Sequence, residues 1–204
     1  LMEDEDLKIQ GLTTLLGDSY PIITCSGKRQ AKVALDIVDK GYCASKDLWY
    51  YGVKLHLLAQ KVPHTLPYPQ MIGVGSASQH DLNFMKPLLE HQNMGEIYLD
   101  KAYCDVVLQQ QLLNQNIHLH TPIKDKKGEC EFEKQRNKAT KSAINTFIAR
   151  MRQPIESFFQ WVNQKTNLQN ASKVRSKNGL MLHIFGKIAV AILILKNKYF
   201  QLYS

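Results

Sequence analysis

The chain has 204 residues, of which 44% are hydrophobic and 22% are charged. This composition is ordinary for a globular protein and excludes a largely disordered chain. One well-packed domain is expected, because two domains of this total length would each have a small core. The four cysteines are scattered, with no C-x-x-C pair and no signal peptide. That pattern favours reduced thiols in a cytosolic protein over disulfides or a structural zinc site.

The net charge of +8 is unevenly distributed. Residues 1–119 contain 10 Lys and Arg against 13 Asp and Glu, whereas residues 120–178 contain 13 against 5. No carboxylate side chain follows Glu156, but seven lysines and arginines do. A basic C-terminal half of this kind indicates contact with a polyanion. A solvated basic surface without a partner is the alternative.

The first part of the chain is expected to begin with a lead-in over residues 1–16, frayed or helical at its start. A short apolar run then leads to Asp18, and Pro21 keeps the following stretch extended. Alternating apolar residues over 50–58 predict a strand with one buried face. A Pro-rich turn separates this strand from a partner strand predicted over 71–74.

The middle of the chain predicts alternating helices and strands. Asp81 is expected to be the N-cap of a helix with apolar spacing over 82–89. Residues 96–99 predict a short buried strand, 106–113 a helix and 117–123 another strand. This order predicts an α/β architecture with a partly parallel sheet.

The last third is predicted in three pieces. Residues 124–142 are charged and contain few apolar residues, so we expect a long exposed loop. Helical spacing returns over 147–162 but is interrupted by Pro154, where a long helix kinks or a new helix begins. The last element, about 179–198, is apolar on most sides and is expected to be a buried core helix, too short in its apolar run to span a bilayer.

Three carboxylates stand in distinctive settings: Asp18 in Gly-Asp-Ser-Tyr-Pro-Ile, Asp100 in Tyr-Leu-Asp-Lys-Ala-Tyr, and Glu156 in Arg-Gln-Pro-Ile-Glu. Asp18 is expected at the carboxyl edge of the sheet, where α/β folds place their ligands. Hard divalent cations prefer charged oxygen ligands, and two of them stabilise both the attacking and the leaving oxygen of a phosphodiester. The three carboxylates therefore predict a two-metal phosphoryl-transfer site. The structural alternatives are a turn aspartate, a helix-capping aspartate and an Arg152–Glu156 pair on one helix.

Other sites are not indicated by the sequence. No H-x-x-x-H or H-E-x-x-H pattern is present, so a zinc hydrolase is improbable. The chain also has no G-x-S-x-G, no P-loop and no dinucleotide fingerprint.

Five segments carry a family resemblance: Gly17–Ile22, Tyr50–His56, His80–Asp81, Leu99–Tyr103 and Arg152–Glu156. In content and in order they resemble the motifs of the DDE transposases of bacterial insertion sequences, over about residues 17–195. The resemblance implies a ribonuclease H-like fold, with a mixed sheet flanked by helices on both faces. It implies that Asp18, Asp100 and Glu156 are the catalytic residues and the metal ligands.

The resemblance also implies two Mg²⁺ ions, with Mn²⁺ as a substitute. Asp18 would contact both ions, and Asp100 and Glu156 one each. A water would cleave DNA at the transposon end, and the freed 3′-hydroxyl would attack target DNA. The implied partner is double-stranded DNA, to which the protein would bind as a homo-dimer. The implied location is the bacterial cytoplasm, and no membrane partner is implied. Six cations would contact its phosphates without reading sequence: Lys101, Arg152, Lys165, Lys173, Arg175 and Lys177.

Relatives usually carry a helical end-recognition domain before the first aspartate. Only 17 residues precede Asp18 here, so residues 1–204 are expected to form the catalytic domain without that domain. Two alternatives stay open. One is a truncated, inactive remnant that only binds DNA, and the other is a different ribonuclease H-like nuclease, such as a junction resolvase.

Overall fold

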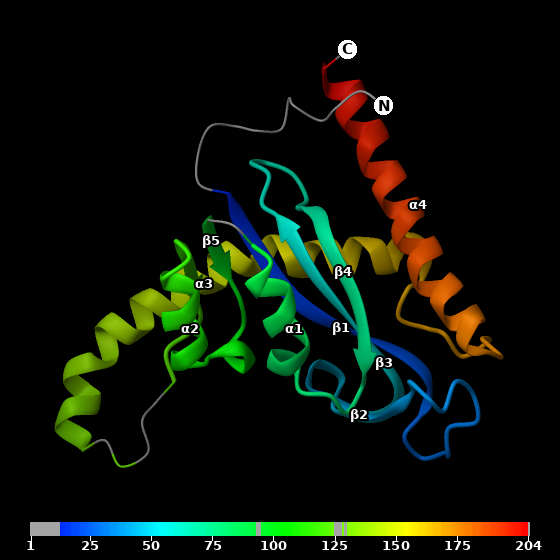
Figure 1. Ribbon diagram of the computed structural model, residues 1–204, viewed down its shortest axis with the longest axis horizontal. Coiled ribbons are helices and arrows are strands. Elements are labelled where there is room, and N and C mark those ends of the chain that lie inside the picture. Colours follow the sequence, from blue (N-terminus) through cyan, green and yellow to red (C-terminus); the bar gives the residue numbers. More distant parts are fainter. Residues whose placement is uncertain (1–12, 93–94, 125–127, 129, 204) are drawn as a thin grey trace.

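The computed structural model describes residues 13–92, 95–124, 128 and 130–203. It contains a six-stranded mixed sheet with helices packed against it (Figure 1). Of the lead-in expected over residues 1–16, residues 1–12 lie outside the described residues, and Thr14–Leu16 are instead the start of a strand. In chain order the elements are β1 (Thr14–Ser26), β2 (Asp39–Cys43), η2 (Ala44–Lys46), β3 (Leu48–Gln60), β4 (Tyr68–Ser76), α1 (Asp81–Glu90), β5 (Gly95–Tyr98), η3 (Lys101–Tyr103), α2 (Val106–Leu113), β6 (Ile117–His120), α3 (Glu131–Thr166) and α4 (Lys177–Tyr203).

The sheet combines an antiparallel half with a parallel half. Its order is β2-β3-β1-β5-β6, and β4 pairs with the same edge of β3 as β2, farther along the strand. β1, β3 and β4 are antiparallel neighbours, whereas β1, β5 and β6 run parallel. The α/β class and the partly parallel sheet predicted from the order of elements are confirmed.

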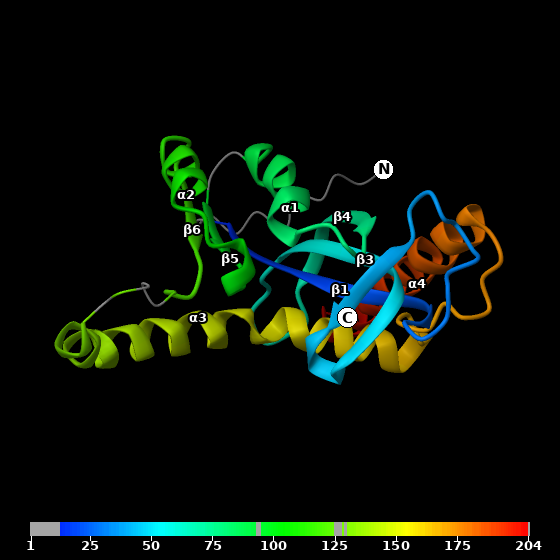
Figure 2. The same ribbon diagram turned by 90° about the horizontal axis from the view of Figure 1, so that it is seen from below.

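Alternating side chains along the strands build a core on each face of the sheet. Leu16 and Leu57 belong to the core that α3 and α4 cover, while Leu15 and Leu58 belong to the core beneath α1 and α2. Figure 2 shows α3 on one side of β1, with α1 and α2 on the other. This period of two follows from strand geometry, because successive side chains point to opposite faces.

The strand that carries Asp18 is longer than the sequence suggested. β1 runs for 13 residues, and Asp18 lies inside it, opposite Leu57 of β3, rather than at a strand end. The extended stretch includes Pro21, which pairs with Lys54. A proline is tolerated there because the parallel pairing of β1 with β5 ends at Leu16, so no neighbouring strand needs its missing N–H.

Most of the short elements were predicted correctly. The strands expected over 50–58, 71–74 and 96–99 and the helix over 106–113 are β3, β4, β5 and α2. β6 ends at His120, three residues earlier than expected. The N-cap of α1 is His80, whose side chain accepts a hydrogen bond from the N–H of Leu82, so the assignment to Asp81 was wrong by one residue.

The loop predicted over 124–142 was wrong for most of its length. α3 begins at Glu131 and continues for 36 residues, through Pro154, so no new helix begins at that proline. The first turns of α3 are mostly exposed. Residues 131–142 contain mainly Glu, Lys, Gln, Arg, Asn, Thr and Ala, several of which favour helices, but they show no apolar stripe.

The prediction of a buried C-terminal helix is correct for one face only. α4 buries Leu180, Ile184, Ile188, Ala191 and Leu195 against the core, at the spacing of one helical stripe. Its other side exposes apolar residues: Leu182, Phe185, Val190 and Leu193. By length and composition, Lys177–Asn197 is apolar enough to cross a membrane, with 28% of it buried. Helices in protein cores also meet this criterion, and one face of α4 packs in the core.

Candidate active site

Two strand segments bring Asp18 and Asp100 to the same place. β1 and β5 pair in parallel from Thr14 to Leu16, and β5 ends at Tyr98. Asp18 and Asp100 follow the last paired residues at the same spacing, two positions beyond each. Gly17 permits the close approach, because a Cβ there would lie 2.3 Å from Cδ2 of Leu99.

Helix α3 supplies the third carboxylate together with an arginine. Stacking of Phe159 on Tyr20, with ring centroids 4.8 Å apart, anchors α3 on β1. Arg152 then reaches the two aspartates: its Nη1 lies 3.1 Å from Oδ1 of Asp100, and its Nη2 lies 3.3 Å from Oδ2 of Asp18. The same Nη2 is 3.9 Å from Oε1 of Glu156, one helical turn further along. One guanidinium is thus shared by three carboxylates.

The environment of this cluster is uneven. The side chain of Arg152 is only 9% exposed, whereas those of Asp100 and Glu156 are 47% and 55% exposed. Burial raises the pKa of Asp18 to about 6 from 3.8, against the lowering effects of Arg152 and of the Ser19 N–H. Asp100 and Glu156 raise this pKa further through their negative charge. The partly buried Asp18 is therefore poorly neutralised by the single cation beside it.

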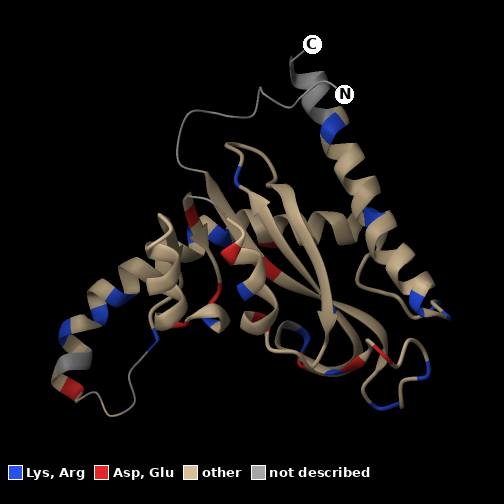
Figure 3. Cartoon of the chain, in the orientation of Figure 1, with Lys and Arg blue, Asp and Glu red and all other residues tan. Residues whose placement is uncertain are grey.

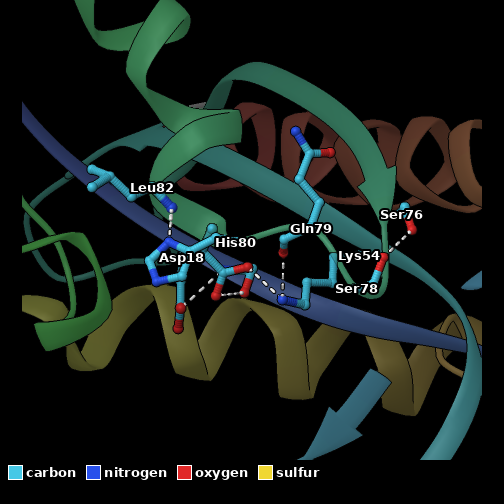
Figure 4. A network of polar contacts seen from close by, with 9 residues as sticks. Asp18, Lys54, Ser76, Ser78, Gln79, His80 and Leu82 are labelled. Atoms are coloured by element: carbon cyan, nitrogen blue, oxygen red, sulfur yellow. Dashed lines mark hydrogen bonds and ion pairs between the residues drawn. The ribbon is translucent and has the colours of Figure 1, made fainter. Parts of the chain in front are cut away.

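A second polar group lies on the opposite face of β1. Asp81, the first residue of α1, accepts hydrogen bonds from Lys54 at 2.8 Å and from the hydroxyl of Ser19 at 3.2 Å. Lys54 also donates to the carbonyl of Gln79 at 3.0 Å. Figure 4 shows Lys54 reaching from β3 toward the segment that precedes α1. The sequence motifs gave this Lys54–Asp81 clamp no role, although a lysine within the apolar alternation of β3 was a visible signal.

His56 and Tyr103 complete the interior on that face. His56 is fully buried and stacks on Phe84 of α1, with ring centroids 4.0 Å apart. Burial lowers the pKa of His56 to about 4, so the ring is neutral at neutral pH. Tyr103, three residues after Asp100, is buried on the same face of the sheet, and its hydroxyl is buried too.

The family model described as Transposase DDE domain matches residues 8–177, most of the chain. The chain belongs to this family. Membership gives it a transposase-type function with DNA as its partner, as the motif order predicted. Among curated proteins, no match is found.

The donor chemistry of the cluster of Asp18, Asp100 and Glu156 fits a hard divalent cation. Its three carboxylates offer charged oxygens, with no thiol or imidazole among them. As the side chains lie, they converge on the Arg152 guanidinium. Within the part of the chain that the structure describes, no three or more His, Cys, Asp or Glu side chains form a group that could hold a metal ion. The three carboxylates are thus suitable ligands for such a cation. For them to bind it, their side chains must move relative to Arg152.

The predicted DNA-contacting cations of the transposase domain fall into two groups. Arg152 is buried among the carboxylates, whereas the other five are exposed: Lys101, Lys165, Lys173, Arg175 and Lys177. Lys101 directly follows Asp100, and Lys177 pairs with Asp36 at 2.5 Å. Lys165 lies in the last turn of α3, and Lys173 and Arg175 lie in the segment that joins α3 to α4. Figure 3 shows this basic character continuing along α4, which carries no acidic residue.

Proposed function

We propose that this domain is a Mg²⁺-dependent DNA transposase that cleaves transposon ends and joins the freed 3′-hydroxyl to target DNA. Asp18, Asp100 and Glu156 are its catalytic residues. The observation that carries the proposal is the three-to-one arrangement of these carboxylates around Arg152. Such an excess of negative charge suits a site completed by external cations.

The three carboxylates would hold the divalent cations, which supply charge neutralisation for phosphoryl transfer when bound. Arg152 contacts all three side chains, which come from β1, from the segment that follows β5 and from α3. Its Nε is buried and makes no hydrogen bond with the described residues. Its bonds to Asp18 and Asp100 come from the two Nη atoms, and charge-assisted bonds of this kind are strong.

The fold supports the same proposal at a finer level. A mixed sheet with helices on both faces, and with carboxylates from β1, the end of β5 and α3 at its centre, is the arrangement expected of a ribonuclease H-like domain. We further propose an insertion-sequence transposase that works as a homo-dimer on DNA in the bacterial cytoplasm. Lys101, Lys165, Lys173, Arg175 and Lys177 would hold DNA phosphates without reading sequence.

Metal-dependent DNA cleavage by purified protein tests the proposal. Supercoiled plasmid and a duplex carrying the transposon end are incubated with Mg²⁺ or Mn²⁺, and nicked and joined products are separated on gels. Alanine at Asp18, Asp100 or Glu156 is expected to lower the cleavage rate by a factor of about 10³ or more, since each carboxylate is needed. Glu90→Gln removes an exposed carboxylate of α1 and serves as the matched control.

Each result of this assay has a definite meaning. Cleavage that survives Asp100→Ala in a folded variant would contradict the assigned site. DNA binding without any cleavage by the parent would favour the DNA-binding remnant. Cleavage of branched DNA alone would favour a junction resolvase.

A further inference from the structure

A basic hollow lies where the chain turns from α3 into α4. Its cavity volume is about 560 Å³. The lining combines cationic and amide side chains and contains neither Asp nor Glu. The lining residues are Asn167, Asn170, Ser172, Lys173, Val174, Arg175, Ser176, Gly179, His183 and Lys187.

The positive charge in this hollow has no acidic counterpart. Lys187 is half-buried, and its Nζ donates to the carbonyl of Asn167 at 2.8 Å and lies 3.4 Å from Nε2 of His183. Burial lowers the pKa of Lys187. Among the described residues no ion pair joins Lys187 to a carboxylate, and the sequence has no carboxylate side chain after Glu156. A cation desolvated in this way is stabilised by an anion beside it.

Arg175 at the edge of the hollow retains donors for such an anion. Its Nη1 donates to the carbonyls of Ser172 and Val174, both at 3.2 Å. These bonds fix the side chain through one of its three nitrogens, and a guanidinium has five N–H donors in all. Planar donors of this type match a phosphate group. Lys177, by contrast, pairs with Asp36 and does not line the hollow.

The hollow is joined to the strand that carries Asp18. The N–H of Ile23 donates to the carbonyl of Gln169 at 2.8 Å, and the N–H of Ala171 donates to the carbonyl of Ile23 at 2.9 Å. Ile23 is five residues along β1 from Asp18, which is roughly 17 Å of extended strand. This places the rim of the hollow near the C-terminal end of β1, apart from the carboxylate cluster.

We propose that this hollow is a phosphodiester-binding site that holds the DNA backbone away from the phosphate at the carboxylate cluster. The proposal rests on the proposed DNA function. It assigns to Lys187, Arg175 and His183 a shared role that the sequence motifs did not show: fixing how far the bound duplex extends from the reacting bond.

Two measurements test the hollow separately from catalysis. In the first, fluorescence anisotropy follows binding of a duplex of about 20 base pairs without divalent cations, over a range of salt concentrations. Log affinity falls as log salt rises, and Lys187→Met and Arg175→Gln are each expected to reduce the steepness of this fall by about one. Lys196→Met removes an exposed cation of the same helix outside the hollow and is expected to have a smaller effect. Equal effects of all three variants would overturn the proposal.

In the second measurement, inorganic phosphate is titrated while NMR follows the ring signals of His183. We expect saturable shifts in the parent and their loss in Lys187→Met, with thermal unfolding checking that the variant is folded. Absence of shifts in the parent would overturn the anion site. Shifts with phosphate, together with unchanged salt slopes for DNA, would overturn the DNA form of the proposal and indicate a small-anion site. A parent without any salt-dependent DNA binding would contradict the proposed function itself.

The spacing is tested on a substrate that the parent cleaves. Single neutral methylphosphonates are placed at successive positions along each strand, and binding to the parent and to Lys187→Met is compared. One position should weaken binding to the parent but not to Lys187→Met, and we expect it to lie away from the cut. A sensitive position directly beside the cut would contradict a site that is separate from the carboxylate cluster.

Discussion

The two faces of the β1–β3 pair hold charged groups of the same kinds in different proportions. On the α3 face, three carboxylates share Arg152, and two of the three side chains are about half-exposed. On the α1 face, Lys54 and Asp81 form a one-to-one pair at 2.8 Å, with side chains 19% and 20% exposed. The balanced pair joins β3 to α1, whereas the unbalanced cluster retains negative charge that an external cation can neutralise.

This difference separates a structural polar group from a functional one. A matched pair satisfies its own charges and attracts no ligand. In the cluster, burial raises the pKa of Asp18, and the negative charges of Asp100 and Glu156 add to this effect; such perturbed groups concentrate at functional sites. The hypotheses below use the same distinction, from the largest expected effect to the smallest.

Neutralising Asp18 is expected to stabilise the fold at neutral pH. Its pKa is about 6 in the folded chain against 3.8 for the free group, so its contribution to stability is full below about pH 3.8 and is lost as pH rises through 6. At about 1.4 kcal/mol per pKa unit, Asp18→Asn should be more stable than the parent by about 3 kcal/mol above pH 7, and nearly equal to it near pH 3.5.

Urea unfolding in the presence of a chelator, at both pH values, measures this difference. Glu90→Gln is the control, since that exposed carboxylate is expected to change stability little at either pH. A variant that is no more stable than the parent at neutral pH would show that Arg152 compensates fully for the burial of Asp18.

The buried imidazole on the other face should give the opposite pH dependence. The pKa of His56 is about 4 in the folded chain against 6.5 for the free group, so stability is lost as pH falls from 6.5 toward 4. Near pH 5 this loss is about 2 kcal/mol relative to pH 7. His56→Leu, which keeps a side chain of similar volume, should remove that part of the slope.

Thermal unfolding across this pH range checks the assignment. His118→Gln, at an exposed position of β6, is the matched control and should keep the slope of the parent. An unchanged slope in His56→Leu would mean that another group causes the acid sensitivity.

Removing the shared guanidinium should strengthen metal binding. In Arg152→Gln the three carboxylates lose their internal cation, and we expect Mn²⁺ affinity to rise about tenfold, equivalent to about 1.4 kcal/mol. Calorimetry with Mn²⁺ measures it, and Arg150→Gln, an exposed arginine on the same helix, is the control. Weaker Mn²⁺ binding by a folded Arg152→Gln variant would indicate that Arg152 orients the ligands rather than competing with the metal.

The clamp on the α1 face should give the smallest effect. A double-mutant cycle with Lys54→Met and Asp81→Asn is expected to yield a coupling free energy of about 1 kcal/mol, because the pair is one-to-one and partly buried. Urea unfolding of the four proteins provides the value. A coupling near zero would remove the clamp as a link between β3 and α1.

Sequence analysis succeeded where the signal was local. β3 and β4 were predicted because their signals lie within short segments: alternating apolar residues over 50–58, and a Pro-rich turn between the two strands. α3 before residue 143 was missed because an exposed helix needs no apolar stripe, and its charged residues resemble those of a loop. α4 was predicted to be fully buried because its composition does not reveal which side meets the core, and only packing leaves Leu182 and Leu193 exposed.

The sequence by itself determined the order of the carboxylate motifs, the α/β class and the basic character of the C-terminal half. Only the tertiary structure decided that Asp18 lies within a strand, and that Arg152 contacts both Asp18 and Asp100, 134 and 52 residues away in the chain. It also decided that residues 167–187 enclose a basic hollow. The physical reason is that local periodicity encodes which side of a strand or helix is apolar, whereas contacts between distant charges depend on strand register and on where a helix crosses the sheet.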